Sequence, residues 1–305
     1  MPSVGVIIPT LDAGEEISNL LSLVLAQSLT PSEILVIDSS SEDDTQAQVS
    51  KYPEVRLEVI DRSEFDHGGT RHDAATKTTC EIICFLTQDA VPSSERYLED
   101  LIKPFSDHSI AMVTGRQLPK QDARPFEQLV RGFNYPSTSF VRSVDDIPRL
   151  GIKAFFASDV CSAYRRTAYI DVGGFDRPLN TNEDMLIASR FLRAGWRIAY
   201  SAEASVFHSH NLTPIQQYRR NYEVGAFLES HKEEFNGINE IGEGKRLVKE
   251  VSKVLISKGQ IIELANFGLD CVARILGNRA GRRSVRKRDR VLGDQRAVTV
   301  SSEKS

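Results

Sequence analysis

Cysteine is scarce in this sequence. The 305 residues contain four, at positions 80, 84, 161 and 271, and no two form a Cys-x-x-Cys pair, which argues against a zinc ribbon. A chain of this length buries enough apolar surface to fold without disulfides. No run of about 18 apolar residues is present, so no membrane-spanning helix is expected. The motifs G-x-G-x-x-G and G-x-x-x-x-G-K-[ST] are also missing, so neither a dinucleotide-dependent dehydrogenase nor a P-loop NTPase is supported.

Composition places the chain among globular proteins. Hydrophobic residues make up 40% and charged residues 26%, which excludes collagen, a disordered chain and a polytopic membrane protein. The apolar run at residues 4–8 is too short for a secretory signal, and acidic residues follow at once. Cysteines that flank an apolar run behave as buried hydrophobes, so we expect a reducing, cytoplasmic compartment.

Basic residues gather near the C-terminal end. Residues 274–290 contain eight basic residues and one acidic residue, a local charge of +7. Because the whole chain carries −4, the remainder carries −11. An acidic body without a recognised nucleic-acid-binding module argues against nucleic acid as a partner.

The first half alternates predicted strands with predicted helices. Short apolar or β-branched runs predict strands at residues 4–8, 33–37, 55–60 and 81–86. Helical periodicity and helix-start signals predict helices at residues 15–27, 42–50 and 68–79. This order predicts an α/β fold with a mostly parallel central sheet and helices on both faces. Such sheets bind ligands beyond the carboxyl ends of their strands.

The second half is less regular and ends in helices. Strands are predicted at residues 111–115, 155–158, 197–200 and 204–207, and a helix at residues 183–194. From residue 214 nearly to residue 277 the pattern is helical. We therefore predict an α/β domain over residues 1–235, a basic helical extension over residues 236–295 and a disordered polar tail over residues 296–305.

Two carboxylates follow predicted strands. Asp38 can accept hydrogen bonds from a ribose or a base, or cap the next helix. Asp89 can hold a divalent cation that bridges two phosphates, or serve as a turn residue. The residue pattern by itself leaves both alternatives open.

Three further segments carry polar residues of functional types. At residues 67–71 a glycine pair, a helix start and Arg71 favour an anion, although an ordinary turn has the same features. Glu183 and Asp184 stand at the start of a predicted helix. They can include a general base, or they can simply be acids that the helix dipole favours in the first turn. His208 and His210 alternate at a strand end and share a face, where they can bind a metal ion or a phosphate or have a structural role.

Taken together, these segments resemble a known family. VIIPT at residues 6–10, DSSS at 38–41, Asp89 and the Glu183-Asp184 pair occur in the order and spacing of inverting family 2 glycosyltransferases with the GT-A fold. The resemblance covers about residues 3–235. Within the family, the sequence resembles the bacterial O-antigen rhamnosyltransferases in particular. It is carried there by FDHGGTR at residues 65–71, LTQDA at 86–90, GRQLP at 115–119, AYRR at 163–166, GGF at 173–175 and HSHN at 208–211.

The resemblance implies a donor, an acceptor and a cofactor. The donor is dTDP-β-L-rhamnose, the acceptor is a sugar on a polyprenyl diphosphate lipid, and the cofactor is Mg²⁺ or Mn²⁺. The implied reaction is inverting transfer of rhamnose in the synthesis of O-antigen or another surface polysaccharide. The implied donor-binding residues are Pro9, Thr10, Asp38, Ser40, Arg71, Gln88 and Asp89. The implied metal ligands are Asp89 with His208 or His210, and the implied base is Asp184, with Glu183 beside it.

Three residues depart from the usual family pattern. Ser40 occupies the place of a glycine, His72 occupies the place of an asparagine, and the metal motif TQD has a single carboxylate at Asp89. The alternatives are a different donor, such as a UDP-hexose, and a non-catalytic nucleotide-sugar-binding protein. The presence of both Asp89 and Asp184 argues against the second alternative.

The C-terminal helical segment has a wide apolar face. Within residues 256–276, apolar residues at 261, 262, 264, 265, 267, 269, 271, 272, 275 and 276 flank one narrow polar stripe at positions 263, 266, 270 and 274, and the basic cluster follows directly. This pattern is typical of an interfacial helix and predicts peripheral association with the inner face of the cytoplasmic membrane. The alternative is that the helix packs on the α/β domain or on a second subunit in a homodimer.

Overall fold

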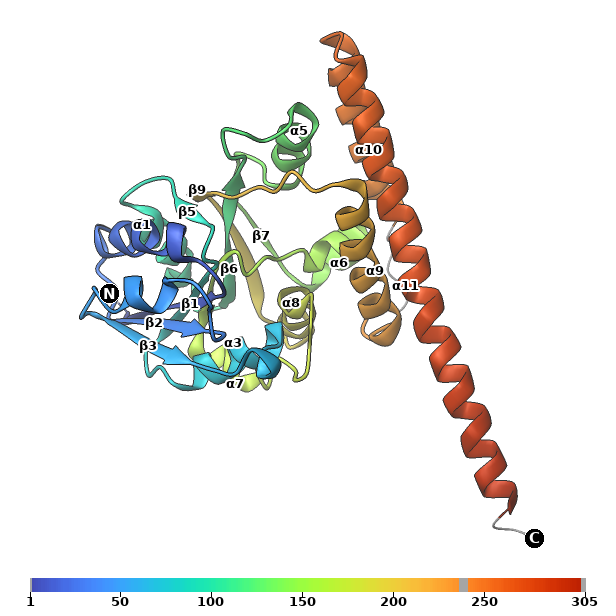
Figure 1. The fold of residues 1–305 in the computed structure, drawn as a ribbon, viewed down its shortest axis with the longest axis horizontal. Helices are drawn as coiled ribbons and strands as arrows, with labels where there is room; N and C mark the ends of the chain where they lie inside the picture. Colours follow the sequence, from blue (N-terminus) through green and yellow to red (C-terminus); the bar gives the residue numbers. More distant parts are fainter. Residues whose placement is uncertain (1, 236–240, 303–305) are drawn as a thin grey trace. The chain divides into compact units, whose positions relative to one another are not determined.

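The computed structural model describes residues 2–235 and 241–302 (Figure 1). The chain separates into two compact units, the first ending at His210 and the second beginning at Asn211. The sequence placed this boundary near residue 235. The difference arises because the first helix after His210 packs with the C-terminal helices.

The first unit is built on one nine-stranded sheet. Its main path has the order β3-β2-β1-β4-β8-β6-β9-β5, and β7 pairs with β9 beside that path. The strands are β1 (Val4–Thr10), β2 (Glu33–Asp38), β3 (Val55–Val59), β4 (Ile82–Leu86), β5 (Val91–Pro92), β6 (Ile110–Leu118), β7 (Phe140–Arg142), β8 (Cys161–Arg165) and β9 (Arg197–Phe207).

The predicted α/β fold is confirmed, and its parallel part is the half formed by β1 to β4. These four strands pair in parallel, as do β6 and β9. β8 is antiparallel to both β4 and β6, and β5 and β7 are antiparallel to β9, so the complete sheet is mixed. The apolar pattern of a buried strand is the same in both directions, which is why the sequence did not reveal these reversals.

Helices cover both faces of the sheet, as predicted. The α-helices of this unit are α1 (Gly14–Leu25), α2 (Thr45–Val49), α3 (His67–Thr76), α4 (Tyr97–Ile102), α5 (Pro125–Asn134), α6 (Ile147–Leu150), α7 (Arg166–Asp171) and α8 (Glu183–Arg193). Four short 3₁₀ helices connect them: η1 (Arg62–Glu64), η2 (Lys103–Ser106), η3 (Val144–Asp146) and η4 (Gly151–Phe155).

Each face of the sheet has its own core. On one face, Leu21 of α1 and Leu101 of α4 join the buried side chains of β1 and β2 in a single cluster. On the other, Tyr164 of β8 is the centre of an aromatic group whose rings lie 5.6 to 6.1 Å apart, with partners from β4, α7 and α8. β1, β2 and β4 are almost wholly buried, as expected for strands covered on both sides.

Two predicted strands of the second half differ from the structure. Residues 155–158 form no strand. Phe155 is instead the last residue of η4, and its buried side chain accounts for the apolar signal. The two strands predicted at residues 197–200 and 204–207 are one continuous strand, β9. Its pairing with β6 is irregular between Gly115 and Arg116, which explains the interrupted sequence pattern.

The second unit consists of three helices, α9 (Pro214–Ser230), α10 (Ile241–Ser257) and α11 (Ile261–Ser302). α9 and α11 approach closely, since a Cβ on Gly277 would lie 2.3 Å from the carbonyl oxygen of Tyr218. The sequence predicted a disordered tail from residue 296, but α11 continues to Ser302 because no proline interrupts it. Residues 303–305 of that tail lie outside the described residues.

The predicted polar stripe of α11 is partly or fully buried, and its apolar side chains divide between buried ones, such as Phe267 and Ala273, and exposed ones. Asp270 is 6% exposed and accepts a hydrogen bond from Arg274 at 2.6 Å. The exposed apolar side chains of this helix include Ile262, Leu269, Val272, Ile275 and Leu276. Among the described residues, no helix is both long enough and apolar enough to cross a membrane.

Candidate active site

Several predicted donor-binding residues surround one cavity at the carboxyl ends of β1 and β4. The cavity has a volume of about 410 Å³. It is lined by Pro9, Thr10, Leu11, Ser39, Arg62, Phe65, His67, Arg71, Thr87 and Gln88. The structure therefore brings together Pro9, Thr10, Arg71 and Gln88, as predicted. Arg62 had not been singled out, because the segment before residue 65 carries no family motif.

Three polar atoms at this cavity are buried without a hydrogen-bond partner. They are Ser39 Oγ, Arg71 Nε and Thr87 Oγ1. A buried polar group without a partner costs about 1–3 kcal/mol, so a protein retains few of them by chance. Ser39, Arg71 and Thr87 thus bring unused hydrogen-bonding capacity to the cavity wall, which makes this cavity a candidate binding site.

Gln88 shapes the cavity through the backbone of the neighbouring strand end. Its Oε1 accepts a hydrogen bond from Leu11 N at 2.8 Å, and its Nε2 donates to Leu11 O at 3.1 Å. This pair of bonds ties the loop after β4 to the end of β1. The amide is thus engaged with the protein, where it holds the cavity wall.

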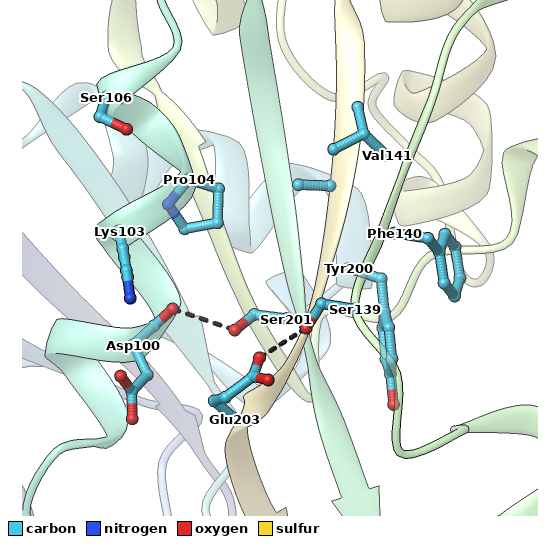
Figure 2. Close-up of a pocket in the computed structure, with 11 residues that line it drawn as sticks. Asp100, Lys103, Pro104, Ser106, Ser139, Phe140, Val141, Tyr200, Ser201 and Glu203 are labelled. Carbon is cyan, nitrogen blue, oxygen red and sulfur yellow. Dashed lines mark hydrogen bonds between the residues drawn. The ribbon is translucent and has the colours of Figure 1, made fainter.

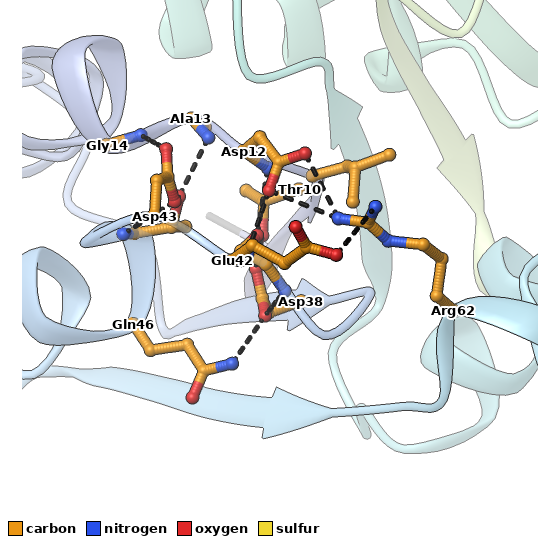
Figure 3. Close-up of polar contacts among 12 residues, drawn as sticks. Thr10, Asp12, Ala13, Gly14, Asp38, Glu42, Asp43, Gln46 and Arg62 are labelled. Carbon is orange, nitrogen blue, oxygen red and sulfur yellow. Dashed lines mark hydrogen bonds and ion pairs between the residues drawn. The ribbon is translucent and has the colours of Figure 1, made fainter.

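Asp38 is placed differently from the sequence expectation. It is fully buried and does not line the cavity. Figure 3 shows its carboxylate among polar partners, and its oxygens accept hydrogen bonds from Thr10 Oγ1, Ser41 N, Ser41 Oγ and Gln46 Nε2. Four donors saturate the carboxylate, so Asp38 holds the turn after β2 rather than contacting a nucleoside directly.

Ser40 also turns away from the cavity. It adopts a left-handed backbone conformation with φ of 53°, which explains why the family pattern has a glycine here. Its hydroxyl donates to Ile60 O at 2.7 Å. That bond offsets the conformational cost and preserves the turn without the glycine, while placing Ser40 outside the cavity lining.

Arg62 forms the exposed rim of the cavity. Its guanidinium lies 3.0 Å from Asp12 Oδ2 and 3.4 Å from Glu42 Oε1 (Figure 3). Exposed ion pairs of this kind contribute little to stability. They do fix the direction of the Arg62 side chain, which contributes a donor group to the cavity wall.

The glycine pair before Arg71 serves packing. Asp66 caps α3 by accepting a hydrogen bond from Gly69 N at 2.7 Å. A Cβ on Gly68 would lie 2.4 Å from Asp176 O, so a side chain there would displace the segment before α8. Of the two alternatives for this glycine pair, the structure favours the turn before a helix, because Gly68 allows α3 to begin against its neighbour.

Arg71 connects the cavity to the start of α8. Its side chain is 5% exposed, and Nη1 lies 3.2 Å from Glu183 Oε1 and 3.1 Å from His67 Nδ1. Partial burial of the ring and the adjacent Arg71 charge lower the pKa of His67, so its Nδ1 accepts rather than donates. Because Glu183 is engaged with Arg71, the geometry favours Asp184 over Glu183 as a base.

Asp184 lies in a group of three carboxyl side chains. Its Oδ2 accepts a hydrogen bond from Asp159 N at 3.2 Å, and its Oδ1 accepts from Met185 N at 2.7 Å. Burial, together with the neighbouring Glu183 and Asp159, raises the pKa of Asp184 well above its ordinary value. A carboxylate with a raised pKa is a stronger base, which suits it to remove a proton from a hydroxyl.

Asp159 was not singled out by the sequence analysis. It is 3% exposed, and its Oδ1 accepts hydrogen bonds from Ser162 Oγ and Tyr164 Oη, each at 2.6 Å. Burial and the Glu183 charge raise the pKa of Asp159 to about 6. No motif pointed to this residue, because only the fold brings the segment before β8 to the start of α8.

Asp89, His208 and His210 form a compact cluster beside the cavity. Asp89 Oδ2 lies 3.4 Å from His208 Nε2 and 3.3 Å from His210 Nε2, and the two imidazole nitrogens are 3.1 Å apart. Lys120 Nζ is 3.9 Å from the same carboxylate oxygen. Burial alone would raise the pKa of Asp89, but His208, His210 and Lys120 hold it well below its usual range.

The donor set of this cluster fits a divalent cation. Ligand atoms about 2.1 Å from a metal ion and at right angles to each other are about 3 Å apart. The three separations in the cluster are 3.1 to 3.4 Å. One carboxylate oxygen and two imidazole nitrogens could therefore occupy one face of an octahedral ion and leave the other positions to phosphate oxygens and water.

A second cavity lies elsewhere on the first unit and contains none of these residues. Its volume is about 490 Å³. Figure 2 shows its lining, where Ser139 donates to Glu203 and Ser201 donates to the backbone oxygen of Asp100. These groups already have partners within the protein. None of the residues that the sequence singled out lines this second cavity.

The mixed sheet with its helices on both faces is the architecture of glycosyltransferases with the GT-A fold. A solved structure with this architecture is the mannosyltransferase PcManGT of Pyrobaculum calidifontis, in complex with GDP-Man and Mn²⁺. It aligns with a TM-score of 0.62 over 91% of this chain and 87% of its own, at 15% sequence identity. The likeness establishes the fold.

Sequence comparison identifies the family within that class. Residues 5–173 match the model for glycosyl transferase family 2, and the chain belongs to this family. It is 40% identical to the O-antigen chain rhamnosyltransferase WbaN of Salmonella anatum, over 92% of this chain and 90% of that protein. It is 38% identical to RfbN of Salmonella typhimurium, described in the same words, over 92% and 89% of the two chains. The protein is therefore a glycosyltransferase.

Proposed function

We propose that this enzyme transfers L-rhamnose from dTDP-β-L-rhamnose to a saccharide carried on a polyprenyl diphosphate lipid, in the synthesis of O-antigen or a related surface polysaccharide. The observation that carries the proposal is the likeness to two O-antigen chain rhamnosyltransferases over about nine tenths of each chain. The cavity, the Asp89 cluster and Asp184 provide the groups that such a transfer requires.

The proposed donor lies across the cavity and the cation cluster. The nucleoside occupies the 410 Å³ cavity, whose lining includes Thr10, Arg71 and Gln88. The diphosphate extends toward Asp89, His208 and His210, and Lys120 adds positive charge there. Two of the three donor atoms are nitrogen, which first-row transition ions accept more readily than Mg²⁺, so we propose Mn²⁺ as the preferred ion.

The proposed reaction is a single displacement. Asp184 takes the proton of the acceptor hydroxyl while that oxygen forms a bond to the anomeric carbon of rhamnose. The bond from that carbon to the diphosphate oxygen breaks, and its electron pair leaves with dTDP. A bound cation supplies charge stabilisation for the leaving diphosphate. One displacement inverts the configuration, so a β-linked donor gives an α-rhamnoside.

The donor assignment predicts a selective response to thymidine nucleotides. In the presence of Mn²⁺, dTDP should raise the unfolding temperature more than UDP or GDP does at equal concentration. Incubation with a panel of nucleotide sugars and a lipid-linked acceptor should then show transfer from dTDP-rhamnose. Transfer from a UDP-hexose with equal or better stabilisation by UDP would overturn the donor assignment, although the enzyme class would stand.

We further propose that α11 rests on an anionic membrane surface, where a lipid-linked acceptor is located. Its exposed side chains form one stripe along the helix, apolar at Ile262, Leu269, Val272 and Leu276. The stripe continues as the exposed basic residues Arg279, Arg283, Lys287 and Arg290, spaced three or four residues apart. An apolar face that continues into basic residues is complementary to lipid chains beside anionic headgroups.

Charge reversal on this stripe is expected to weaken vesicle binding. Since each basic residue near an anionic surface contributes about 1 kcal/mol, Arg283→Glu with Lys287→Glu should lower affinity for phosphatidylglycerol vesicles by about 30-fold or more. Lys245→Glu with Lys249→Glu on α10 is the matched control and should bind as the unmodified protein does. Equal binding by both pairs would contradict the proposal. So would a dimer in light scattering that Leu269→Glu dissociates, because the stripe would then be a subunit interface.

A further inference from the structure

Gln117, in the GRQLP segment, lies between the cation cluster and the base. It is on β6, close to that strand's end at Leu118, and is 2% exposed. Its Oε1 is 2.9 Å from His208 Nδ1, and its Nε2 donates to Ser158 Oγ at 2.8 Å. Ser158 precedes Asp159, whose backbone N–H donates to Asp184. One buried amide therefore contacts His208 directly and reaches the segment that bonds Asp184 through Ser158.

The neighbours of Gln117 fix which end of the amide faces His208. Arg131 Nη1 also donates to the atom assigned as Oε1, and a guanidinium has hydrogen-bond donors only. The atom between Arg131 and His208 must therefore be the oxygen. Glu127 pairs with Arg131 at 2.8 Å and holds the guanidinium in this position.

The fixed amide determines the hydrogen on His208. Because Gln117 Oε1 can only accept, His208 Nδ1 must carry a hydrogen and donate it. The other ring nitrogen, Nε2, faces Asp89 and His210. Its lone pair is therefore the one offered to a cation, in the direction that the cluster geometry requires.

We propose that Gln117 is a positioning residue that holds His208 in the Nδ1–H tautomer and so prepares Nε2 as a metal ligand. The inference rests on the proposed cation site. Gln117 contacts no substrate, and it acts through His208 on one side and through Ser158 on the other. Among the hydrogen bonds of the described residues, Gln117 Oε1 is the one side-chain acceptor that His208 Nδ1 has.

Two substitutions and a control separate positioning from packing. Gln117→Met has a similar length and no amide, so His208 Nδ1 loses its acceptor. Gln117→Glu keeps an acceptor for both His208 and Arg131. Gln128→Met removes an exposed glutamine of α5 whose amide bonds Ala123 O, and it serves as the matched control.

The first measurement is Mn²⁺ affinity of the full chain by electron paramagnetic resonance, without nucleotide. Gln117→Met should lower the affinity about 10–100-fold, the usual cost of losing a partner of a metal-ligating histidine. Gln117→Glu should restore it to within a few-fold, and Gln128→Met should leave it unchanged. Unchanged affinity in Gln117→Met, or an equal loss in Gln117→Glu, would overturn the proposal.

The second measurement is the ¹⁵N spectrum of histidine-labelled, metal-free protein at a pH where the imidazole is neutral. His208 should appear as the Nδ1–H tautomer in the unmodified protein and in Gln117→Glu, and as a mixture in Gln117→Met. An unchanged tautomer in Gln117→Met would overturn the positioning role. If the unmodified protein binds no Mn²⁺, the cation site fails, whereas the tautomer result still tests whether Gln117 orients His208.

Discussion

Replacing Asp184 by asparagine is expected to lower the rate of sugar transfer by about 10²–10⁴-fold, the usual cost of losing a general base. The amide keeps the size of the side chain and can still accept from Met185 N or Asp159 N, but it cannot take a proton. Affinity for dTDP should barely change, since Asp184 does not line the donor cavity. Transfer kinetics and nucleotide titration measure the two effects separately.

The pH dependence of transfer gives an independent check on Asp184. The carboxyl must be ionised to act, and burial beside Glu183 and Asp159 raises its pKa. Transfer should therefore decrease as pH falls through that raised pKa, at a higher pH than for an exposed carboxyl. Glu16→Gln, an exposed acid in the first turn of α1, is the matched control and should not affect the rate. Full transfer by Asp184→Asn would exclude it as the base.

Replacing Asp89 by alanine is expected to remove Mn²⁺-dependent binding of dTDP. The cluster would retain only two imidazole nitrogens, and the anionic oxygen that both of them face would be lost. Since losing a partner of a ligand already costs about 10–100-fold in metal affinity, losing the carboxylate ligand should cost at least about 100-fold. Calorimetric titration with Mn²⁺, followed by dTDP, measures both steps.

The comparison needs a control for the removal of a carboxylate. Asp145→Ala removes an exposed aspartate on η3 and should leave Mn²⁺ affinity as it is. Asp89→Ala should also unfold at a temperature close to that of the unmodified protein, because the half-buried carboxylate faces the cluster rather than the core. If Asp89→Ala still showed Mn²⁺-dependent transfer at the full rate, Asp89 would be a turn residue and not a metal ligand.

The sequence predicted those parts of the site that depend on local patterns. A polar residue after a buried strand marks the carboxyl edge of a parallel sheet, and Asp89 lies at that edge in the structure, beside His208 and His210. Thr10, which the family resemblance implied, lines the cavity there. Two histidines spaced by one residue were expected to share a face, and both contact Asp89. Asp38 fits the same pattern but is saturated by protein donors, because the pattern does not reveal how many neighbours satisfy a carboxylate.

The remaining contacts depend on tertiary structure. Asp159 reaches Asp184 from a segment 25 positions away, and Gln117 reaches His208 across 91 positions. The antiparallel insertion of β8 between β4 and β6 brings these segments together, and strand direction leaves no trace in an apolar pattern. The burial of the polar stripe of α11 was likewise hidden, because an amphipathic pattern does not say which face another helix covers.

The unpartnered atoms at the cavity also bear on how the proposed donor would be distinguished from other nucleotides. Ser39 Oγ, Arg71 Nε and Thr87 Oγ1 are shielded from water and lack partners before any ligand binds. A nucleotide with a group that reaches one of them would relieve a cost of about 1–3 kcal/mol, or roughly 5–150-fold in affinity, and a nucleotide without that group would leave the cost in place. Discrimination would therefore come from the relief that the correct ligand brings, with no added penalty on an incorrect one.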